Sequence, residues 1–414
     1  MQTAVKHTER LEWRKLVVPT ALRKAPVHRW FVFPHSFTDG LVRGLIEEWG
    51  LGPGDRILDP FVGAGTTVLT AKQLGIPAHG VDLSPLAVFV TNVKVAAHDA
   101  SAIRQALPAV LKDAGEAAVG GETELLHRAF TPLALRRLCD LRGRIRRVPD
   151  ARMRDFLLLG LLAILRDFSS LKADGGWLRA GQPRLSADQV LPRFRHHVED
   201  MLSDLSESQT GTPGSWGAKV GDARELAGDA KYSAVITSPP YPNRHDYSRI
   251  FQVELEFGFH GADGTYAFRH SSIRSHPEAR PPAAQHNSYI APARLTAALD
   301  ELRVKKPDPR IPAMLAGYFE DMHAVLRRLC DILRPGAHLA LVVGNVRYLG
   351  VSFPVDELLT EIAAGLGYEP IEIRAVRYRG NSAQQMGEYG REAAREACVV
   401  LAYKLPFEDS GRAW

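Results

Sequence analysis

Cysteine is scarce in this sequence, since its 414 residues include only Cys139, Cys330 and Cys398. No two of them form a CxxC pair, so neither a zinc site nor a disulfide framework is predicted. The N-terminal stretch MQTAVKHTERLEWRK is charged and lacks the apolar core of a secretory signal. The longest apolar run, FLLLGLLAIL at 156–165, is too short to span a bilayer. These absences predict a soluble protein in the reducing environment of the cytoplasm.

Charge of one sign is not in large excess either. The formal net charge is +5, and the composition, with 45% hydrophobic and 24% charged residues, is that of an ordinary globular protein. At 414 residues, the chain is long enough to bury a large core. Its mildly basic character makes an anionic partner worth testing. The histidines show no ligand spacing with carboxylates, so no metal is expected.

What the sequence does contain is a repeated strand–helix rhythm. RILDPFVGAGTTVLTAKQLG reads as a short apolar strand, a Gly-rich turn and a helix, and PAHGVDLSPLAVFVTNVKVA repeats strand and helix. This spacing predicts βαβ units and an α/β fold with a mainly parallel sheet.

Changes in this rhythm divide the chain into five segments. Residues 1–100 contain the first strand–helix units, and 101–217 are helical in pattern and rich in arginine. Residues 218–260 return to strand character and contain YSAVITSPPY, whereas 261–314 are rich in Pro, His and Arg and read as a long loop or small insert. Residues 315–414 complete the α/β pattern with a helix at 318–333, the strand-like LRPGAHLALVVGNV and a further helix at 355–366.

The Gly-rich turn LDPFVGAGTT predicts a ligand site at the end of the first strand. Gly63 and Gly65 allow the backbone to approach a ligand closely, but no Lys follows them as in a phosphate-binding loop. Asp59 suits a ligand that carries a positive amine, and Asp82 ends the next strand, where a carboxylate accepts the hydroxyls of a ribose. A nucleoside that carries an amino acid fits this pair better than a pyrophosphate does.

A second site is predicted where YSAVIT meets SPPY. A strand that ends on two prolines cannot continue its ladder, because proline has no N–H to donate. The result is a rigid group of hydrogen-bond acceptors beside an aromatic ring, at the carboxyl end of a strand, where open α/β sheets bind ligands.

Together, DPFVGAGTT and the later TSPPY resemble the motifs of the S-adenosylmethionine-dependent amino-methyltransferases of DNA. The serine form of the second motif is more usual in the cytosine-N4 branch of that family than in the adenine-N6 branch. HRWFVFPHSF, VGDAREL and LRPGAHLALVVGN are similar to further motifs of the family. The resemblance covers roughly residues 28–95 and 218–260 and, more loosely, 318–404. It implies a class I Rossmann-like methyltransferase with a helical insert.

The resemblance also implies functional residues. Those expected to bind S-adenosylmethionine are His35, Ser36, Phe37, Asp59, Pro60, Phe61, Gly63, Gly65, Thr66, Thr67, Asp82, Leu83, Ser84, Asp222 and Ala223. Those expected to be catalytic are Ser238, Pro239, Pro240 and Tyr241. The Ser238 hydroxyl and the Pro239 carbonyl can hold the hydrogens of an exocyclic amine and aim its lone pair at the methyl group. Tyr241 can stack on a base that has rotated out of the duplex.

Several polar residues are candidates for contact with DNA. Asn243, Arg244, Asp246 and Arg249 follow the second motif, and Asp246 is interpreted as holding the loop rather than as accepting a proton. Asn381, Gln384 and Gln385 could read base edges. In the arginine-rich segment, the candidates for phosphate contact are Arg142, Arg144, Arg146 and Arg147.

The order of the motifs leaves alternatives open. Many enzymes of this family carry the catalytic half first, whereas here the cofactor half comes first, as in some RNA guanine-N2 methyltransferases. The predicted function is methylation of cytosine N4 in duplex DNA, with a cognate restriction endonuclease as a potential partner. Adenine-N6 methylation, RNA guanine-N2 methylation and a catalytically inactive nucleic-acid-binding protein are the alternatives.

Overall fold

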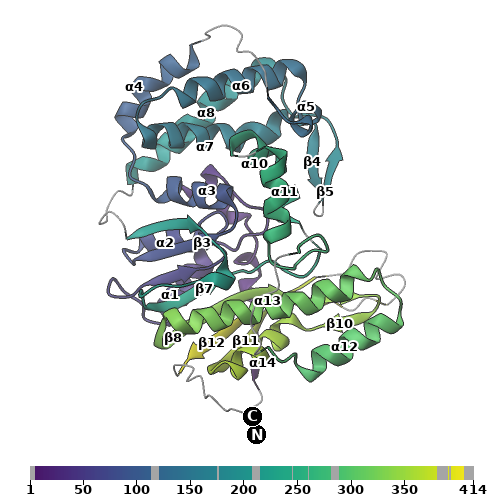
Figure 1. Cartoon of the computed structure of the whole chain (residues 1–414). Coiled ribbons are helices and arrows are strands. Elements are labelled where there is room, and N and C mark those ends of the chain that lie inside the picture. Colours follow the sequence, from purple (N-terminus) through teal and green to yellow (C-terminus); the bar gives the residue numbers. More distant parts are fainter. Residues whose placement is uncertain are drawn as a thin grey trace.

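The computed structural model describes residues 5–112, 121–174, 177–207, 215–244, 246–259, 261–280, 289–379, 390 and 393–404. Figure 1 shows an α/β part in the lower half of the molecule and a layer of helices above it. In the described part of the chain, no helix is long and apolar enough to cross a membrane. The three cysteines are buried and unpaired.

A mixed eight-stranded sheet forms the centre of the α/β part. In spatial order its strands are β1 (Lys6–Glu9), β11 (Tyr368–Arg379), β12 (Ala394–Tyr403), β8 (Leu333–Gly344), β7 (Tyr232–Thr237), β2 (Ile57–Asp59), β3 (Ala78–Asp82) and β6 (Trp216–Val220). Pairings β6–β3, β3–β2, β2–β7 and β7–β8 are parallel, whereas β12 runs antiparallel between β8 and β11. The strand order reverses between β2 and β7, and such switch points of doubly wound sheets bind ligands.

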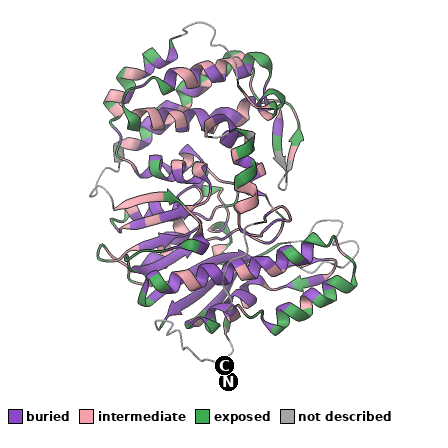
Figure 2. Ribbon diagram, viewed as in Figure 1, coloured by how far each residue is buried: buried purple, intermediate pink, exposed green. Residues whose placement is uncertain are grey.

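Helices cover both faces of this sheet. On one face lie α1 (Asp39–Glu48), α2 (Thr66–Gln73) and α3 (Pro85–Val95), and on the other lie α13 (Arg310–Ile332) and α14 (Val355–Gly365). The central strands are almost entirely buried, whereas the edge strands β1 and β6 are mostly exposed or half-buried, and the helices are buried on the side that faces the sheet (Figure 2). The predicted Rossmann-like fold with a mainly parallel sheet is confirmed.

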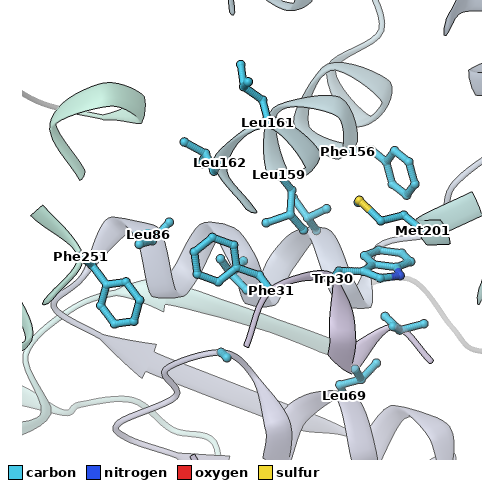
Figure 3. Packing of buried hydrophobic residues seen from close by; sticks show 14 of the residues in the cluster. Trp30, Phe31, Leu69, Leu86, Phe156, Leu159, Leu161, Leu162, Met201 and Phe251 are labelled. Carbon is cyan, nitrogen blue, oxygen red and sulfur yellow. The ribbon is translucent and has the colours of Figure 1, made fainter. Parts of the chain in front are cut away.

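The described residues between Ala100 and Glu207 form the helical layer above α3, whereas residues 216 and 217 belong to β6. Its helices are α4 (Ala100–Leu111), α5 (Glu124–Ala129), α6 (Pro132–Arg146), α7 (Ala151–Phe168) and α8 (Val190–Ser203), and α7 leads into a hairpin of β4 (Leu171–Asp174) and β5 (Trp177–Ala180). Figure 3 shows Trp30 and Phe31 between this layer and the α/β part. Trp30 packs edge-on against Phe156 of α7, with ring centroids 5.2 Å apart. One continuous core therefore joins the insert to the region of the Gly-rich turn.

Strand β7 is followed by α9 (Tyr247–Ile250), α10 (Gln252–Gly258) and α11 (Ala262–Ser271). The segment expected as a loop at 261–314 is largely helical, because it contains α11, α12 (Ala293–Val304) and the start of α13. Leu295, Leu299 and Leu302 of α12 are buried at helical spacing, a signal that the Pro-rich composition around them obscured. The helix expected at 318–333 begins eight residues earlier, at Arg310. A small ribbon, β9 (Val346–Tyr348) with β10 (Val351–Phe353), follows β8.

Candidate active site

Two cavities lie at the carboxyl ends of the central strands. The first, called here the cofactor cavity, is lined by Phe33–Phe37, Asp59–Gly63, Thr66, Asp82–Ser84, Gly221–Ala223, Ser238, Pro240, Tyr247, Ser248, Phe251, Phe268, Ser272, Ile273, Ser275 and His276. It includes every residue predicted to bind the cofactor except Gly65 and Thr67. Among the lining residues there is neither Lys nor Arg.

The second cavity shares one wall with the first. It is lined by Val17–Pro19, Pro34–Phe37, Ser238, Tyr241, Asn243, Tyr247, Val342, Arg377, Arg379 and Glu396. The residues common to both cavities are Pro34, His35, Ser36, Phe37, Ser238 and Tyr247. The two cavities thus meet at the serine of the TSPPY motif.

The Gly-rich turn has the geometry that its glycines predict. Gly63 and Gly65 have positive φ angles of 49° and 79°. A Cβ atom on Gly65 would lie 2.7 Å from the Thr91 hydroxyl, so a side chain is excluded there on two grounds. The buried Lys94 ammonium donates to the carbonyls of Ala64 and Phe31, at 2.9 and 2.7 Å. This lysine ties the turn to the segment that forms the opposite wall.

Asp59 is buried at the end of β2, with 2% of its surface exposed. Its Oδ1 accepts hydrogen bonds from the Thr237 hydroxyl at 2.6 Å and from the backbone N–H of Phe61 at 3.1 Å. Burial raises the pKa of Asp59 to about 6, against an ordinary value of 3.8. A positively charged group bound beside Asp59 would therefore stabilise its ionised form.

Asp82 ends β3 on the other side of the turn. Its two oxygens accept the backbone N–H groups of Gly63 and Ser84, at 3.0 and 2.9 Å. Burial raises its pKa to about 6 as well. Asp82 therefore both shapes the Gly-rich turn and presents a carboxylate to the cofactor cavity.

Gly65 and Thr67 lie beneath the cofactor cavity and support the residues that line it. Thr67 is fully buried, and its hydroxyl donates to the carbonyl of Ile236 in β7 at 3.0 Å. Gly65 is the residue before α2. Neither lines the cofactor cavity, so the structure places them beneath it.

The wall that both cavities share is held by the helical layer. The carboxylate of Asp204, which follows α8, accepts from the backbone N–H of Val27 and from the side chains of Arg29 and Trp30, at 2.7–3.0 Å. Val27 has a φ of 64°, a strained value for a β-branched residue. The insert thus fixes the chain just before His35, Ser36 and Phe37.

Asp222 and Ala223 belong to the VGDAREL segment and were expected to bind the cofactor. Both line the cofactor cavity. The carboxylate of Asp222 accepts from the backbone N–H of Arg224 at 2.8 Å and pairs with its guanidinium. Arg224 also pairs with Asp321 of α13, which anchors this corner of the cavity to the covering helix.

The TSPPY motif follows β7 without a cis peptide. The Ser238 hydroxyl donates to the carbonyl of Val342 in β8 at 3.1 Å, and its oxygen lies 3.5 Å from the Tyr241 hydroxyl. Because its hydrogen is directed at Val342, the oxygen of Ser238 presents its remaining lone pair as an acceptor. Ser238 and Pro240 line the cofactor cavity, whereas Pro239 is buried behind them.

Tyr241 is fixed at both ends of its ring. A Cβ atom on Gly344 would lie 3.1 Å from the ring, so the ring rests against the backbone of β8. Its hydroxyl donates to Glu396 of β12 at 3.1 Å. Burial and the charge of Glu396 raise the pKa of this hydroxyl well above its ordinary value, so it remains a donor at physiological pH.

The residues after the motif serve mainly the loop itself. Asp246 caps α9 by accepting the N–H groups of Ser248 and Arg249, and it forms ion pairs with the side chains of Arg249 and Arg269. Asp246 thus holds the loop, as interpreted from the sequence, through these two arginines. Arg249 also pairs with Glu278 at 2.7 Å, so its charge is already compensated, which argues against its predicted phosphate contact. Arg244 is exposed, and Asn243 lines the second cavity.

Two of the four arginines proposed to contact phosphate face inward, which corrects that prediction. Arg142 donates to Glu122 at 2.6 Å and to the carbonyl of Phe257 at 2.7 Å. Arg144 is 7% exposed and bonds to Asp140 and to the carbonyls of Val110 and Lys112. Arg146 and Arg147, at the C-terminal end of the same helix, are instead exposed.

Arg142 instead holds α10, and a second arginine of the insert does the same. Arg166 of α7 pairs with the buried Glu254 at 2.5 Å. The insert therefore positions α10, which follows the TSPPY segment in the chain. Asn381, Gln384 and Gln385 lie outside the described residues.

Sequence reasoning missed three polar residues of the second cavity. Arg377 and Arg379 lie near the end of β11, and Glu396 lies near the start of β12, where the antiparallel register pairs it with Arg377. Alternation along β11 would have placed the two arginines on one face, but no local signal links them to a motif about 140 residues earlier. In the described ranges, no group of His, Cys, Asp or Glu could hold a metal ion.

Comparison with known proteins gives the class. No family model matches the chain. Type II methyltransferase M.BsoBI of Geobacillus stearothermophilus is 29% identical over 455 residues, which cover 94% of this chain and 87% of that protein. Type II methyltransferase M.AvaI of Nostoc sp. is 26% identical over 429 residues, which cover 94% of this chain and 88% of that protein.

The chain is thus similar to two Type II methyltransferases over almost its whole length. The resemblance to methyltransferases that use S-adenosylmethionine, predicted from DPFVGAGTT and TSPPY, is confirmed at this level. A shorter match connects the chain to a tRNA (guanine(10)-N2)-dimethyltransferase of Methanothermobacter thermautotrophicus. It is 38% identical over 58 residues, which cover 14% of this chain and 17% of that protein.

Proposed function

We propose that the protein transfers the methyl group of S-adenosylmethionine to the exocyclic N4 amine of cytosine within a short specific site in duplex DNA. The observation that carries this proposal is the position of Ser238 at the junction of two cavities. A methyl donor on one side and an acceptor base on the other would meet at this residue. The similarity to Type II methyltransferases along almost the whole chain supports DNA as the substrate.

The cofactor cavity fits S-adenosylmethionine in its chemistry. Asp59 would hold the ammonium group of the methionine part, and Asp82 would accept the ribose hydroxyls. Asp222 and Ala223 would lie beside the adenine. The absence of Lys and Arg among the lining residues agrees with a ligand that carries positive charge and no phosphate. Bound there, the cofactor supplies a sulfonium methyl group with a good leaving group.

The TSPPY segment would prepare the amine for direct transfer. One amine hydrogen would bond to the oxygen of Ser238 and the other to the carbonyl of Pro239. This arrangement draws the amine lone pair out of conjugation with the ring and toward the methyl group. Transfer would join N4 to the methyl carbon, leave the electron pair of the broken bond on the sulfur, and release one N4 proton to solvent. No covalent bond between enzyme and base is needed.

The second cavity would receive the base after it rotates out of the duplex. Exocyclic amines are inaccessible to the cofactor while the base is stacked, so rotation is required. Tyr241, whose ring is held between Gly344 and Glu396, would stack on the extruded base. A cognate restriction endonuclease is the proposed partner in the cell, although methyl transfer does not require it.

Identification of the methylated nucleoside tests this proposal. Purified protein would be incubated with duplex DNA and labelled S-adenosylmethionine, and the DNA would then be digested and analysed by mass spectrometry. The expected product is N4-methyldeoxycytidine, and a Ser238→Ala control should form it about a hundredfold more slowly.

Detection of N6-methyldeoxyadenosine would instead show that adenine is the target base. Methylation of RNA but not DNA would favour the guanine-N2 alternative, which the short match to a tRNA methyltransferase supports. No labelled product from either nucleic acid would favour an inactive binding protein.

A further inference from the structure

Glu396 is a buried carboxylate with an unusual number of donors around it. Only 2% of its surface is exposed. Arg377 donates to its Oε2 through Nε at 2.7 Å, and Arg379 donates to its Oε1 through Nη2 at 2.7 Å. The Tyr241 hydroxyl donates to the same Oε1 at 3.1 Å. One carboxylate thus joins the aromatic ring of the catalytic motif to two arginines on β11.

The charges of this group do not cancel. Two guanidinium groups and one carboxylate leave one positive charge on the wall of the second cavity. A guanidinium carries five N–H donors on three nitrogens, and the bonds to Glu396 use the Nε and Nη2 atoms of both arginines. The Nη1 donors of both arginines are outside this pairing. The wall is therefore suited to a ligand edge that presents acceptors.

Arg379 is the arginine nearer to the catalytic motif. It shares Oε1 of Glu396 with Tyr241, whereas both bonds of Arg377 go to Oε2. Its side chain is also more accessible, with 43% exposed against 17% for Arg377. Arg377 and Glu396 thus hold Arg379 in place, and Arg379 is free to face a base.

We propose that Arg379 reads the N3 and O2 edge of the extruded cytosine and that Glu396 and Arg377 position it for this contact. This inference rests on the proposed function, because it assigns the residue that selects the base. In cytosine, the two positions next to the amine along its Watson–Crick edge are N3 and O2, and both are acceptors. A guanidinium matches two adjacent acceptors with two parallel N–H groups.

The same edge differs in the two competing bases. In adenine, the position after the acceptor N1 is a C–H group, so one donor of the guanidinium would be left without a partner. In guanine, the position next to the N2 amine on this edge is an N–H donor, which opposes a guanidinium. A site built to hydrogen-bond one base rejects bases that leave its polar groups unpaired. Arg379 would therefore favour cytosine over both alternatives.

The test compares two bases in two forms of the enzyme. The methylated sequence would first be located by sequencing treated plasmid DNA. Synthetic duplexes would then carry either cytosine or 3-deazacytosine at the target, since the analogue keeps O2 and the amine but replaces N3 by C–H. Single-turnover methyl transfer would be measured with the unmodified enzyme and with Arg379→Gln. Comparison of the four rates, as in a double-mutant cycle, cancels the intrinsic difference in reactivity between the two bases.

With cytosine, Arg379→Gln is expected to lose about ten- to a hundredfold in the transfer rate, the usual effect of losing a charged hydrogen bond. The loss that the analogue causes in the unmodified enzyme should largely disappear in the variant. Arg303→Gln is the matched control, because Arg303 is an exposed arginine of α12 paired with Asp300. It should behave as the unmodified enzyme does with both bases.

Two results would overturn the inference. One is an analogue penalty of equal size in the variant and the unmodified enzyme. The other is a variant that weakens DNA binding equally for both bases and flattens its salt dependence, which would make Arg379 a phosphate contact. Either result leaves the proposed function intact if the product is still N4-methylcytosine. A different methylated nucleoside would instead refute the proposed function itself.

Discussion

The hydroxyl of Tyr241 lies 3.1 Å from a carboxylate oxygen of Glu396, although 155 residues separate the two in the sequence. This contact connects the TSPPY segment at the end of β7 to the antiparallel strand β12. Since Glu396 is almost fully buried, loss of its partner leaves part of its hydrogen-bonding demand unmet. Tyr241 is thus held in position by its hydroxyl as well as by its ring.

The first prediction separates these two roles of Tyr241. Tyr241→Phe keeps the ring but loses the bond to Glu396, so methyl transfer should slow by about three- to tenfold. Tyr241→Ala also removes the stacking surface and should lose about a further tenfold or more. Single-turnover transfer with labelled cofactor measures both. Equal rates for the two variants would contradict a stacking role, and cofactor affinity should be unchanged in either.

The second prediction concerns the pH dependence of stability. Burial raises the pKa of Asp59 from 3.8 to about 6, so its ionisation destabilises the ligand-free fold as the pH rises through this interval. Asp59→Asn should therefore raise the free energy of unfolding by about 1–3 kcal/mol at pH 8 and leave it nearly unchanged at pH 4. Denaturant titrations at both pH values measure this.

A matched control for Asp59 is Asp300→Asn on α12, where the side chain is 64% exposed. It should show no such pH dependence. With saturating S-adenosylmethionine at pH 8, the unmodified protein should become more stable than Asp59→Asn, because the ionised Asp59 would then pair with the ammonium group. A variant that is less stable than the unmodified protein at pH 8 without cofactor would contradict this account.

The third prediction distinguishes the inward from the outward arginines of α6. Arg142→Ala leaves Glu122 buried without its ion pair and should cost about 3–5 kcal/mol in the free energy of unfolding. Arg146→Ala and Arg147→Ala change exposed positions and should cost less than about 0.5 kcal/mol each. Chemical denaturation compares the three variants.

DNA binding completes this comparison. If Arg146 or Arg147 contacts a phosphate, its replacement should reduce the slope of log K against log salt by about 0.9. An unchanged slope would make both residues part of a solvated surface. Similar stability of Arg142→Ala and Arg146→Ala would contradict the structural role of Arg142.

Much of the candidate site could be predicted from short segments of the sequence, for a physical reason. A Gly-rich turn between strand and helix, and a strand that ends on two prolines, are each defined by a few adjacent residues. Their convergence follows from the parallel order of β2, β3 and β7, whose carboxyl ends share one edge. The positions of Asp59, Asp82 and Ser238 around one cavity therefore agree with an expectation based on motifs and strand order alone.

The remaining features depend on long-range contacts that no local pattern encodes. Glu396 and Arg379 line the same cavity as Ser238 because β12 inserts between β8 and β11. The opposite orientations of Arg144 and Arg146 depend on which face of α6 meets its neighbours, and charge counting along the sequence cannot supply this. The strained Val27 likewise depends on Asp204, a residue 177 positions away.

The Ser238→Ala variant tests the central claim most directly. The measurement is single-turnover methyl transfer to duplex DNA, combined with calorimetric titration of S-adenosylmethionine. Loss of one of the two acceptors that hold the amine, worth about 3 kcal/mol in the transition state, predicts a rate about a hundredfold lower. Cofactor affinity should remain within about twofold, because the serine holds the base and not the donor. A full rate of transfer in this variant, or a loss explained by weaker cofactor binding, would contradict the account.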